Sequence, residues 1–331
     1  NAIKLASNEN PMGPSPFAIQ AVNNILSGLH RYPDGNALRL KEAICSDQNV
    51  DLDQITIGNG SNDIIEFVVR SFLSSKDSAV FSEHAFAVYP LAVQTVGAQG
   101  IEVPAKDWGH NLSAMNKAIQ KNTKLIFIAN PNNPTGTFIA RDEVISFLDS
   151  VSKDVIVLLD QAYFDYASYE NSDIGVEFIN EFPNLIISRS FSKAYALAGF
   201  RVGYSVSSKE IADFLNRVRQ PFNTNSLALA AAEAALSDKD HMLKSLKMNI
   251  EQKSLLYKGL EDLGYQYIPS AGNFICFDCK QDAEQLFNNL LKEGVIVRSM
   301  GVYKMPNHLR VTIGLPEENN IFLEKLAKVG S

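Results

Sequence analysis

The sequence predicts an α/β protein with a mostly parallel central sheet and a smaller α+β part near its C-terminus. Between residues 54 and 190, short and fully apolar runs alternate with helical patterns. Such runs are typical of parallel strands covered on both faces. The alternation of strand and helix patterns ends at a break over residues 220–225. A length of 331 residues favours one large domain plus a smaller one.

The first part of the chain begins irregularly and then becomes regular. Residues 8–16 are too rich in Pro and Asn for regular structure, and an amphipathic helix is predicted over 17–27. A turn over 30–35 leads into a helix near 37–46. Strands are then predicted over 54–57, 79–81, 124–129, 155–159 and 185–187, with helices over 63–73 and 141–150.

The second part of the chain carries a different pattern. Helices are predicted over 226–236 and 240–263, strands near 273–278, 295–298 and 309–313, and helices near 282–293 and 317–328. We therefore expect a large domain over residues 30–225. A small domain would combine residues 226–331 with the N-terminal arm, residues 1–29.

Composition narrows the classes of function. A net charge of −7 gives no basic surface for nucleic acid, and no apolar run is long enough to span a bilayer. The chain begins at Asn1 rather than Met, so we expect further sequence before it. Cys276 and Cys279 have a C-x-x-C spacing, but a strand there points them to opposite faces, so no metal site is expected.

The segment most informative about function is 188–193, Ser-Arg-Ser-Phe-Ser-Lys, followed eight residues later by Arg201. A lysine amine such as that of Lys193 can condense with an aldehyde, although most lysines are surface charges. The serines and Arg201 can hold a phosphate. An aldehyde and a phosphate on one small molecule describe pyridoxal 5'-phosphate (PLP).

Two further loops fit a phosphate and an aromatic ring. Ligands of open parallel sheets bind beyond the carboxyl ends of the strands. The loop 58–63, Gly-Asn-Gly-Ser-Asn-Asp, offers backbone N–H groups to a phosphate, although it could instead be a simple capping turn with Asn62 or Asp63 as the cap. It matches a dinucleotide fingerprint poorly, because Asp63 stands where the third glycine belongs. Phe86 could stack on a pyridine ring or be a core aromatic.

Polar groups also follow two of the predicted strands. The loop 130–136 is rigid, which a turn would explain, yet it presents Asn133 at the sheet edge. Asp160 ends the apolar run 155–159, and a carboxylate there is costly unless it is paired. A protonated pyridine nitrogen is a suitable partner, and Tyr163 could reach the phenolic oxygen of the ring. The alternative is a capping Asp with a packed Tyr.

Together these motifs resemble a known family. The segments 130–136, 160–163 and 190–193 with Arg201 resemble the fold-type I, class II PLP-dependent aminotransferases. Finer matches are similar to the histidinol-phosphate aminotransferase family and extend over nearly the whole chain; they lie at residues 4–11, 31–34, 58–63, 85–90, 193–201 and 305–314.

The resemblance implies a role for each motif residue. Lys193 binds the PLP aldehyde and later moves a proton between the substrate Cα and the cofactor, while Asp160 keeps the pyridine nitrogen protonated. The remaining contacts to PLP are implied as follows: Asn133 and Tyr163 to the phenolic oxygen, Phe86 to the ring face, and Ser61, Asn62, Ser190, Ser192 and Arg201 to the phosphate. Asn62 departs from the acidic residue of some relatives, which a backbone N–H contact would tolerate.

The resemblance also implies a partner subunit and a substrate. Tyr32 would reach the phosphate in the neighbouring subunit of a homodimer, although it could simply pack locally. Arg310 would bind the anionic end of the substrate, Arg298 is a second candidate, and the arm around Asn8 would close over the site. The implied reaction is transamination between L-histidinol phosphate and 2-oxoglutarate, giving imidazole acetol phosphate and glutamate in cytoplasmic histidine biosynthesis.

Four alternative functions differ in their sequence requirements. An aromatic or broad-specificity aminotransferase would share the motifs, and so would a PLP-dependent decarboxylase of a phosphorylated amino acid. A PLP-binding regulatory module is disfavoured, because the sequence has no helix-turn-helix or basic segment. A nicotinamide dehydrogenase is disfavoured by Asp63 and by the segment around Lys193.

Overall fold

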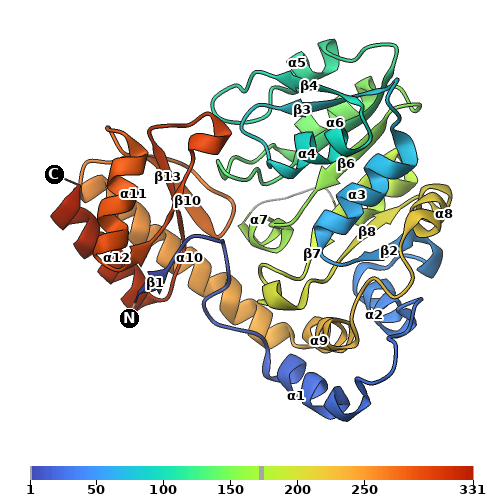
Figure 1. Ribbon diagram of the computed structural model, residues 1–331, viewed down its shortest axis with the longest axis horizontal. Coiled ribbons are helices and arrows are strands. Elements are labelled where there is room, and N and C mark those ends of the chain that lie inside the picture. The colour runs from blue at the N-terminus through green and yellow to red at the C-terminus, as the bar shows by residue number, and fades with distance from the viewer. Residues whose placement is uncertain (1, 171–174, 331) are drawn as a thin grey trace.

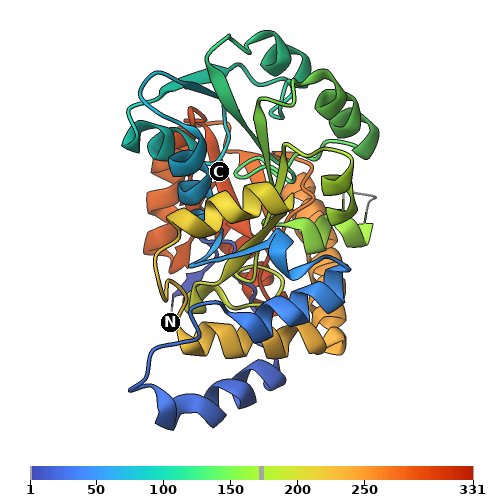
Figure 2. The ribbon, with the colours of Figure 1, turned by 90° about the vertical axis from the view of Figure 1, so that its right-hand side faces the viewer.

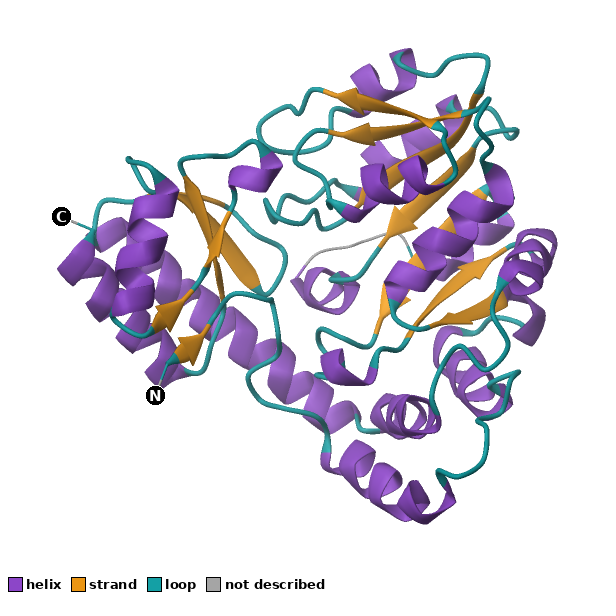
Figure 3. Cartoon of the chain, viewed as in Figure 1, coloured by secondary structure: helices purple, strands orange, loops and turns teal. Residues whose placement is uncertain are grey.

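A seven-stranded sheet forms the centre of the protein, which a computed structural model describes over residues 2–170 and 175–330 (Figures 1 and 3). The strand order is β2-β8-β7-β6-β5-β3-β4, and only β8 runs antiparallel to its neighbours. The strands are β2 Ile55–Gly58, β3 Ser78–Ser82, β4 Gln99–Val103, β5 Thr123–Ala129, β6 Ile156–Asp160, β7 Leu185–Ser190 and β8 Gly203–Ser207. The predicted mostly parallel sheet is therefore confirmed.

Helices cover both faces of this sheet (Figure 2). Alternate residues of β6 enter different cores: Val157 and Leu159 pack on one side, and Leu158 on the other. The first core is closed by α1 Pro16–Ile25, α2 Leu38–Gln48, α5 Leu112–Lys117, α6 Arg141–Ser150 and α9 Ser226–Ser237. The second is closed by α3 Ser61–Phe72, α4 Val88–Thr95 and α8 Lys209–Val218. Apolar burial on both faces fixes the register of the strands and hence the positions of their ends.

A four-stranded antiparallel sheet lies beside the large one, in the order β12-β13-β10-β9. Its strands are β9 Gln266–Ile268, β10 Phe274–Asp278, β12 Arg298–Ser299 and β13 His308–Thr312. Its apolar face packs against α10 Lys239–Asp262, α11 Ala283–Lys292 and α12 Pro316–Val329. The long helix α10 runs from α9 to this sheet (Figure 1). None of the described helices has the length and apolar character needed to cross a membrane.

The N-terminal arm belongs spatially to the C-terminal part of the chain. Strand β1 Ile3–Lys4 pairs in parallel with β11 Val295–Ile296. The arm then passes between the two sheets and reaches α1, which packs against α9. Alanines of α9 share a core with the large sheet, although the predicted boundary places α9 outside residues 30–225. The division into two domains stays a prediction.

The structure differs from the predicted elements in two ways. The single strand expected over 295–298 is wrong, because β11 and β12 are separate and pair with different partners. The elements not predicted are β1, β4, β8, β9, α4, α5, α8 and α7 Phe164–Glu170. Strand β4 lies at the sheet edge and is mostly exposed, so it lacks the continuous apolar run that marks the inner strands.

Candidate active site

The carboxyl ends of β5, β6 and β7 meet at a cavity of about 250 Å³. Its walls include all the residues of this chain that the sequence assigns to cofactor binding within one subunit: Ser61, Asn62, Phe86, Asn133, Asp160, Tyr163, Ser190, Ser192, Lys193 and Arg201. These residues are up to 140 positions apart, and the register of the sheet brings them together. One small ligand could therefore contact all of them, while the role of each stays a prediction.

Asp160 is the buried carboxylate of the cavity, with 6% of its surface exposed. Its Oδ2 atom accepts a hydrogen bond of 2.8 Å from Tyr89 Oη, and Oδ1 accepts one of 3.1 Å from the Ala162 amide. Burial raises the pKa of Asp160, whereas these two bonds and the charge of Lys193 lower it. A cationic group in the cavity would compensate for the buried negative charge.

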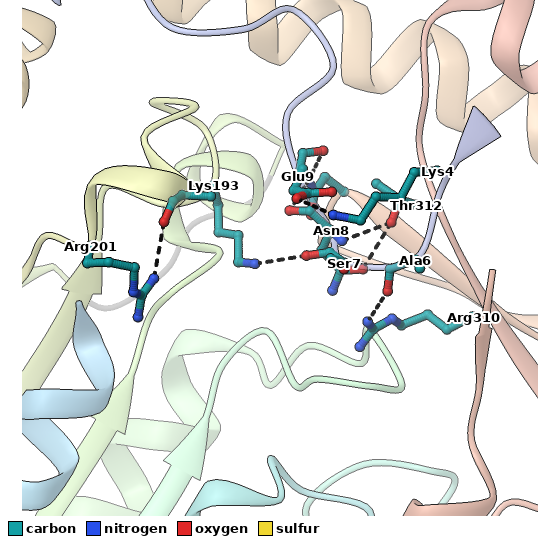
Figure 4. Close-up of polar contacts among 11 residues, drawn as sticks. Lys4, Ala6, Ser7, Asn8, Glu9, Lys193, Arg201, Arg310 and Thr312 are labelled. Atoms are coloured by element: carbon teal, nitrogen blue, oxygen red, sulfur yellow. Dashed lines mark hydrogen bonds and ion pairs between the residues drawn. The ribbon is translucent and has the colours of Figure 1, made fainter. Parts of the chain in front are cut away.

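Lys193 points from the loop after β7 towards the N-terminal arm (Figure 4). Its Nζ donates a hydrogen bond of 3.4 Å to the carbonyl of Ser7 and lies 5.5 Å from the centre of the Tyr163 ring. Asn8 is 1% exposed and adopts a left-handed conformation with φ of 55°. Its side-chain Nδ2 donates a hydrogen bond of 2.8 Å to Tyr163 Oη, and its backbone N–H donates one of 2.9 Å to Thr312 Oγ1. The arm thus lies against the lysine and the tyrosine, although Asn8 itself does not line the cavity.

The opposite end of the cavity is suited to an anion. Helix α3 begins there, and Gly60 is its N-cap. The alternative that placed Asn62 or Asp63 at the cap is therefore wrong. Asp63 instead accepts a hydrogen bond of 2.8 Å from the Asn59 backbone amide. Gly60 has φ of +81°, and a Cβ on it would lie 2.5 Å from Arg201 Nη2. Glycine therefore lets the guanidinium approach the free N–H groups at the start of the helix.

Arg310 connects the small sheet to the cavity wall. Arg310 is buried, with 6% of its surface exposed. Its Nη1 donates a hydrogen bond to Asn133 Oδ1, and its Nη2 donates one of 2.9 Å to the Ala6 carbonyl. Its Nε has no hydrogen-bond partner among the described residues. Burial lowers the pKa of Arg310. Arg298 is exposed and lies directly opposite Arg310 across β12 and β13, so both side chains leave the same face of the sheet.

Tyr32 lies outside this constellation within the single chain. Its side chain is 83% exposed and stacks on Phe222, with ring centres 4.7 Å apart. This contact is the local packing that the sequence left open as an alternative. A role in a partner subunit stays a prediction.

Ser7, Glu9 and Tyr89 also line the cavity but were not predicted as site residues. Tyr89 follows Phe86 by three positions in a segment that already carried the resemblance. That spacing places both rings on one side of the start of α4, where they pack edge to face at 5.8 Å. Ser7 takes part through its backbone carbonyl, which no side-chain motif encodes.

The donor set fits PLP. An amine, an anion site at a helix start and a buried carboxylate surround one cavity, and Phe86 adds an aromatic wall. The close approach of Arg201 to Gly60 leaves no room for a Cβ, as expected of a pocket shaped for a phosphate. The size of the cavity matches one small aromatic molecule.

Comparison with known proteins points in the same direction. The family model described as aminotransferase class I and II matches residues 1–326. Histidinol-phosphate aminotransferase 2 of Pseudomonas fluorescens is 55% identical over 327 residues, which are 99% of this chain and 88% of that protein.

Two solved structures bear on the fold. Histidinol-phosphate aminotransferase from Sinorhizobium meliloti, in complex with pyridoxal-5'-phosphate, superposes with a TM-score of 0.95 at 27% identity, covering 99% of this chain and 90% of that one. L-threonine-O-3-phosphate decarboxylase from Porphyromonas gingivalis superposes with a TM-score of 0.88 at 22% identity, covering 98% of each chain, and this likeness concerns the fold alone.

The contact between Gly60 and Arg201 predicts a specific binding defect. Gly60→Ala displaces the guanidinium, so the dissociation constant of PLP should rise about tenfold or more, as expected for the loss of a hydrogen bond to a charged group. Gly97→Ala is the matched control, because Gly97 has φ of +71° but its nearest neighbour would lie at 3.4 Å, an ordinary contact. Absorbance titration measures both constants, and equal values for the two variants would contradict the predicted role of Arg201.

Proposed function

This chain belongs to the class I and II aminotransferase family, and on that premise we propose that it catalyses PLP-dependent transamination between L-histidinol phosphate and 2-oxoglutarate. The products are imidazole acetol phosphate and glutamate, in a step of histidine biosynthesis. The resemblance and the PLP cofactor predicted from the sequence are confirmed. The observation that carries the proposal is the convergence of Lys193, Asp160, Asn133 and Arg201 on one cavity, in a chain whose relatives are named for this reaction.

Lys193 is the residue proposed to move the proton. Bound PLP supplies an electron-withdrawing ring that stabilises negative charge at the substrate Cα. Lys193 would hold PLP through its aldehyde group, and its amine, when free, would take the proton from the substrate Cα. Asp160 holds positive charge at the ring nitrogen, because a buried carboxylate is stabilised by an adjacent cation.

Two arginines are proposed to select an anionic substrate. A phosphate monoester carries up to about two negative charges, which one guanidinium neutralises only in part. Arg310 has a buried Nε that finds no partner among residues 2–170 and 175–330, and Arg298 leaves the same sheet face beside it. This pair is suited to the phosphate of histidinol phosphate and, in the other half-reaction, to a carboxylate of 2-oxoglutarate.

The N-terminal arm is proposed to exclude water from the reacting groups. Ser7 and Glu9 line the cavity, and Asn8 bonds Tyr163 and Thr312 from the two sides of the site. Substrate binding would exchange the contact between Lys193 and the Ser7 carbonyl for contacts with the bound molecule.

A homodimer with shared sites is the proposed assembly. Tyr32 and Phe222 stack at the surface, and both are substantially exposed. Further exposed apolar side chains occur on or next to α1: Phe17, Ile19, Leu26 and Leu29. A second copy covering this surface would bring Tyr32 to the phosphate end of its partner's cavity. The cytoplasmic location expected from the sequence stays a prediction.

The amino-donor range tests the proposed reaction. With 2-oxoglutarate as acceptor, histidinol phosphate should give a kcat/KM at least about a hundredfold above that of phenylalanine, because phenylalanine cannot use the phosphate-binding arginines. A coupled glutamate assay measures the rates, and Lys193→Ala is the inactive control. Faster turnover of phenylalanine would favour a broad-specificity aminotransferase. Release of CO2 without an oxo acid would favour the decarboxylase.

The two arginines should differ in effect. Arg310→Gln should raise the KM for 2-oxoglutarate about ten- to a hundredfold, because it removes a charged hydrogen-bond donor from a buried position. Arg298→Gln should raise the KM for histidinol phosphate, and less strongly, because Arg298 is exposed. Steady-state kinetics with each substrate varied separately measures both effects. Unchanged KM values in Arg310→Gln would remove this residue from the substrate site.

Mixed dimers test whether Tyr32 acts across the subunit interface. A Tyr32→Ala homodimer should bind PLP about tenfold more weakly than the wild type. In a hybrid of one Lys193→Ala chain and one Tyr32→Ala chain, the intact Lys193 faces the intact Tyr32 of its partner. Such a hybrid, purified with two different affinity tags, should keep one site of wild-type PLP affinity. Weak binding at that site would show instead that Tyr32 acts within its own chain.

A further inference from the structure

The side chain of Tyr89 is held by two aromatic rings and one carboxylate. It is fully buried on α4, stacks on Phe127 with ring centres 4.7 Å apart, and meets Phe86 edge to face. Its hydroxyl donates a hydrogen bond of 2.8 Å to Asp160 Oδ2. A tyrosine in a purely apolar role would not need this hydroxyl, and a hydroxyl buried here is stabilised by such an acceptor.

We propose that Tyr89 is a positioning residue that keeps the proton shared by Asp160 and the ring nitrogen of bound PLP on the nitrogen. This inference rests on the proposed function, since it concerns the same carboxylate and the same cofactor. Tyr89 acts only through Asp160, with which it makes its hydrogen bond. Asp160 Oδ1 is held separately by the Ala162 amide, so the hydroxyl controls the other carboxylate oxygen.

The physical reason lies in the basicity of the carboxylate. Each donor that bonds the charged form of a carboxylate makes it a weaker base. When a carboxylate and a pyridine nitrogen share one proton, the proton resides mostly on the stronger base. With the Tyr89 hydroxyl in place, the nitrogen is favoured; without it, Asp160 competes better for the proton. A neutral ring nitrogen withdraws electrons less well, so the reaction slows.

Tyr89 is suited to this task because its hydroxyl does not lose its proton under working conditions. Burial and the charge of Asp160 raise the pKa of Tyr89 well above its usual value. Besides Tyr89, the groups that act on Asp160 are the Ala162 amide and the charge of Lys193. Tyr89 is the neutral side chain among them, so it bonds Asp160 as a hydrogen-bond donor and not as a second cation.

The test removes the Tyr89 hydroxyl and measures whether the ring nitrogen of PLP carries the proton. Tyr89→Phe keeps both ring contacts and removes only the bond to Asp160. In protein reconstituted with PLP labelled with ¹⁵N in the ring, the nitrogen resonance should move towards that of an unprotonated pyridine. The kcat should fall about tenfold to a hundredfold, as expected for the loss of a hydrogen bond to a charged group, while KM stays within about threefold.

Tyr204→Phe is the matched control. Tyr204 is also buried, at 5% exposure, but its ring lies against Phe191. The same chemical deletion there should leave the ¹⁵N resonance unchanged. An unchanged resonance in Tyr89→Phe, or equal movement in both variants, would overturn the proposal. The resonance does not depend on which amino donor is used, so failure of the proposed reaction and failure of this inference give different results.

A second variant covers the case in which Tyr89→Phe does not fold. 3-Fluorotyrosine at position 89 keeps the ring and the hydroxyl but makes the hydroxyl a stronger donor. The resonance should then move in the opposite direction, towards the fully protonated pyridine. A resonance identical to that of the unmodified protein would show that the bond serves packing only.

Discussion

The site depends on one electrostatic constraint, which is the burial of the Asp160 carboxylate at the end of a fully apolar strand. A charge in that position needs compensation from the groups around it. The protein provides two hydrogen-bond donors and a nearby ammonium, and it leaves a cavity on the remaining side. The apolar strands on either side fix the carboxylate in place, because a shift of register would expose one of the two cores.

The second sheet matters because its side chains hold residues of the cavity wall from outside the cavity. Arg310 bonds both Asn133 on the large sheet side and Ala6 in the arm. Asn8 joins Thr312 on the small sheet to Tyr163 beside Asp160. Asn133 and Tyr163 therefore both line the cavity and take part in the contacts that join the large sheet to the arm and the small sheet.

The sequence predicts the inner strands β5, β6 and β7 and the cavity walls well, for one physical reason. The inner strand β8, by contrast, has no continuous apolar run and was missed; its residues include Gly203, Ser205 and Ser207. Continuous apolar runs mark β5, β6 and β7, and the polar residue that follows each run is conspicuous, as with Asp160 and Lys193. Contacts made by backbone atoms, such as the Ser7 carbonyl, leave no trace in residue type. Tyr89 was missed because a buried tyrosine looks like any core aromatic until its acceptor is known. Edge strand β4 was missed because exposure removes the apolar pattern.

The pairing of β1 with β11 affects the order in which the protein can fold during synthesis. Ile3 lies beside Val295, and the Leu5 carbonyl accepts from the Thr312 amide. During synthesis Ile3 and Lys4 therefore have no partner strand until Val295 and Ile296 have left the ribosome. The large sheet, whose strands end at Ser207, can assemble earlier. Until then β11 does not hold the arm, so the cavity walls built on the large sheet can form before the arm is fixed beside them.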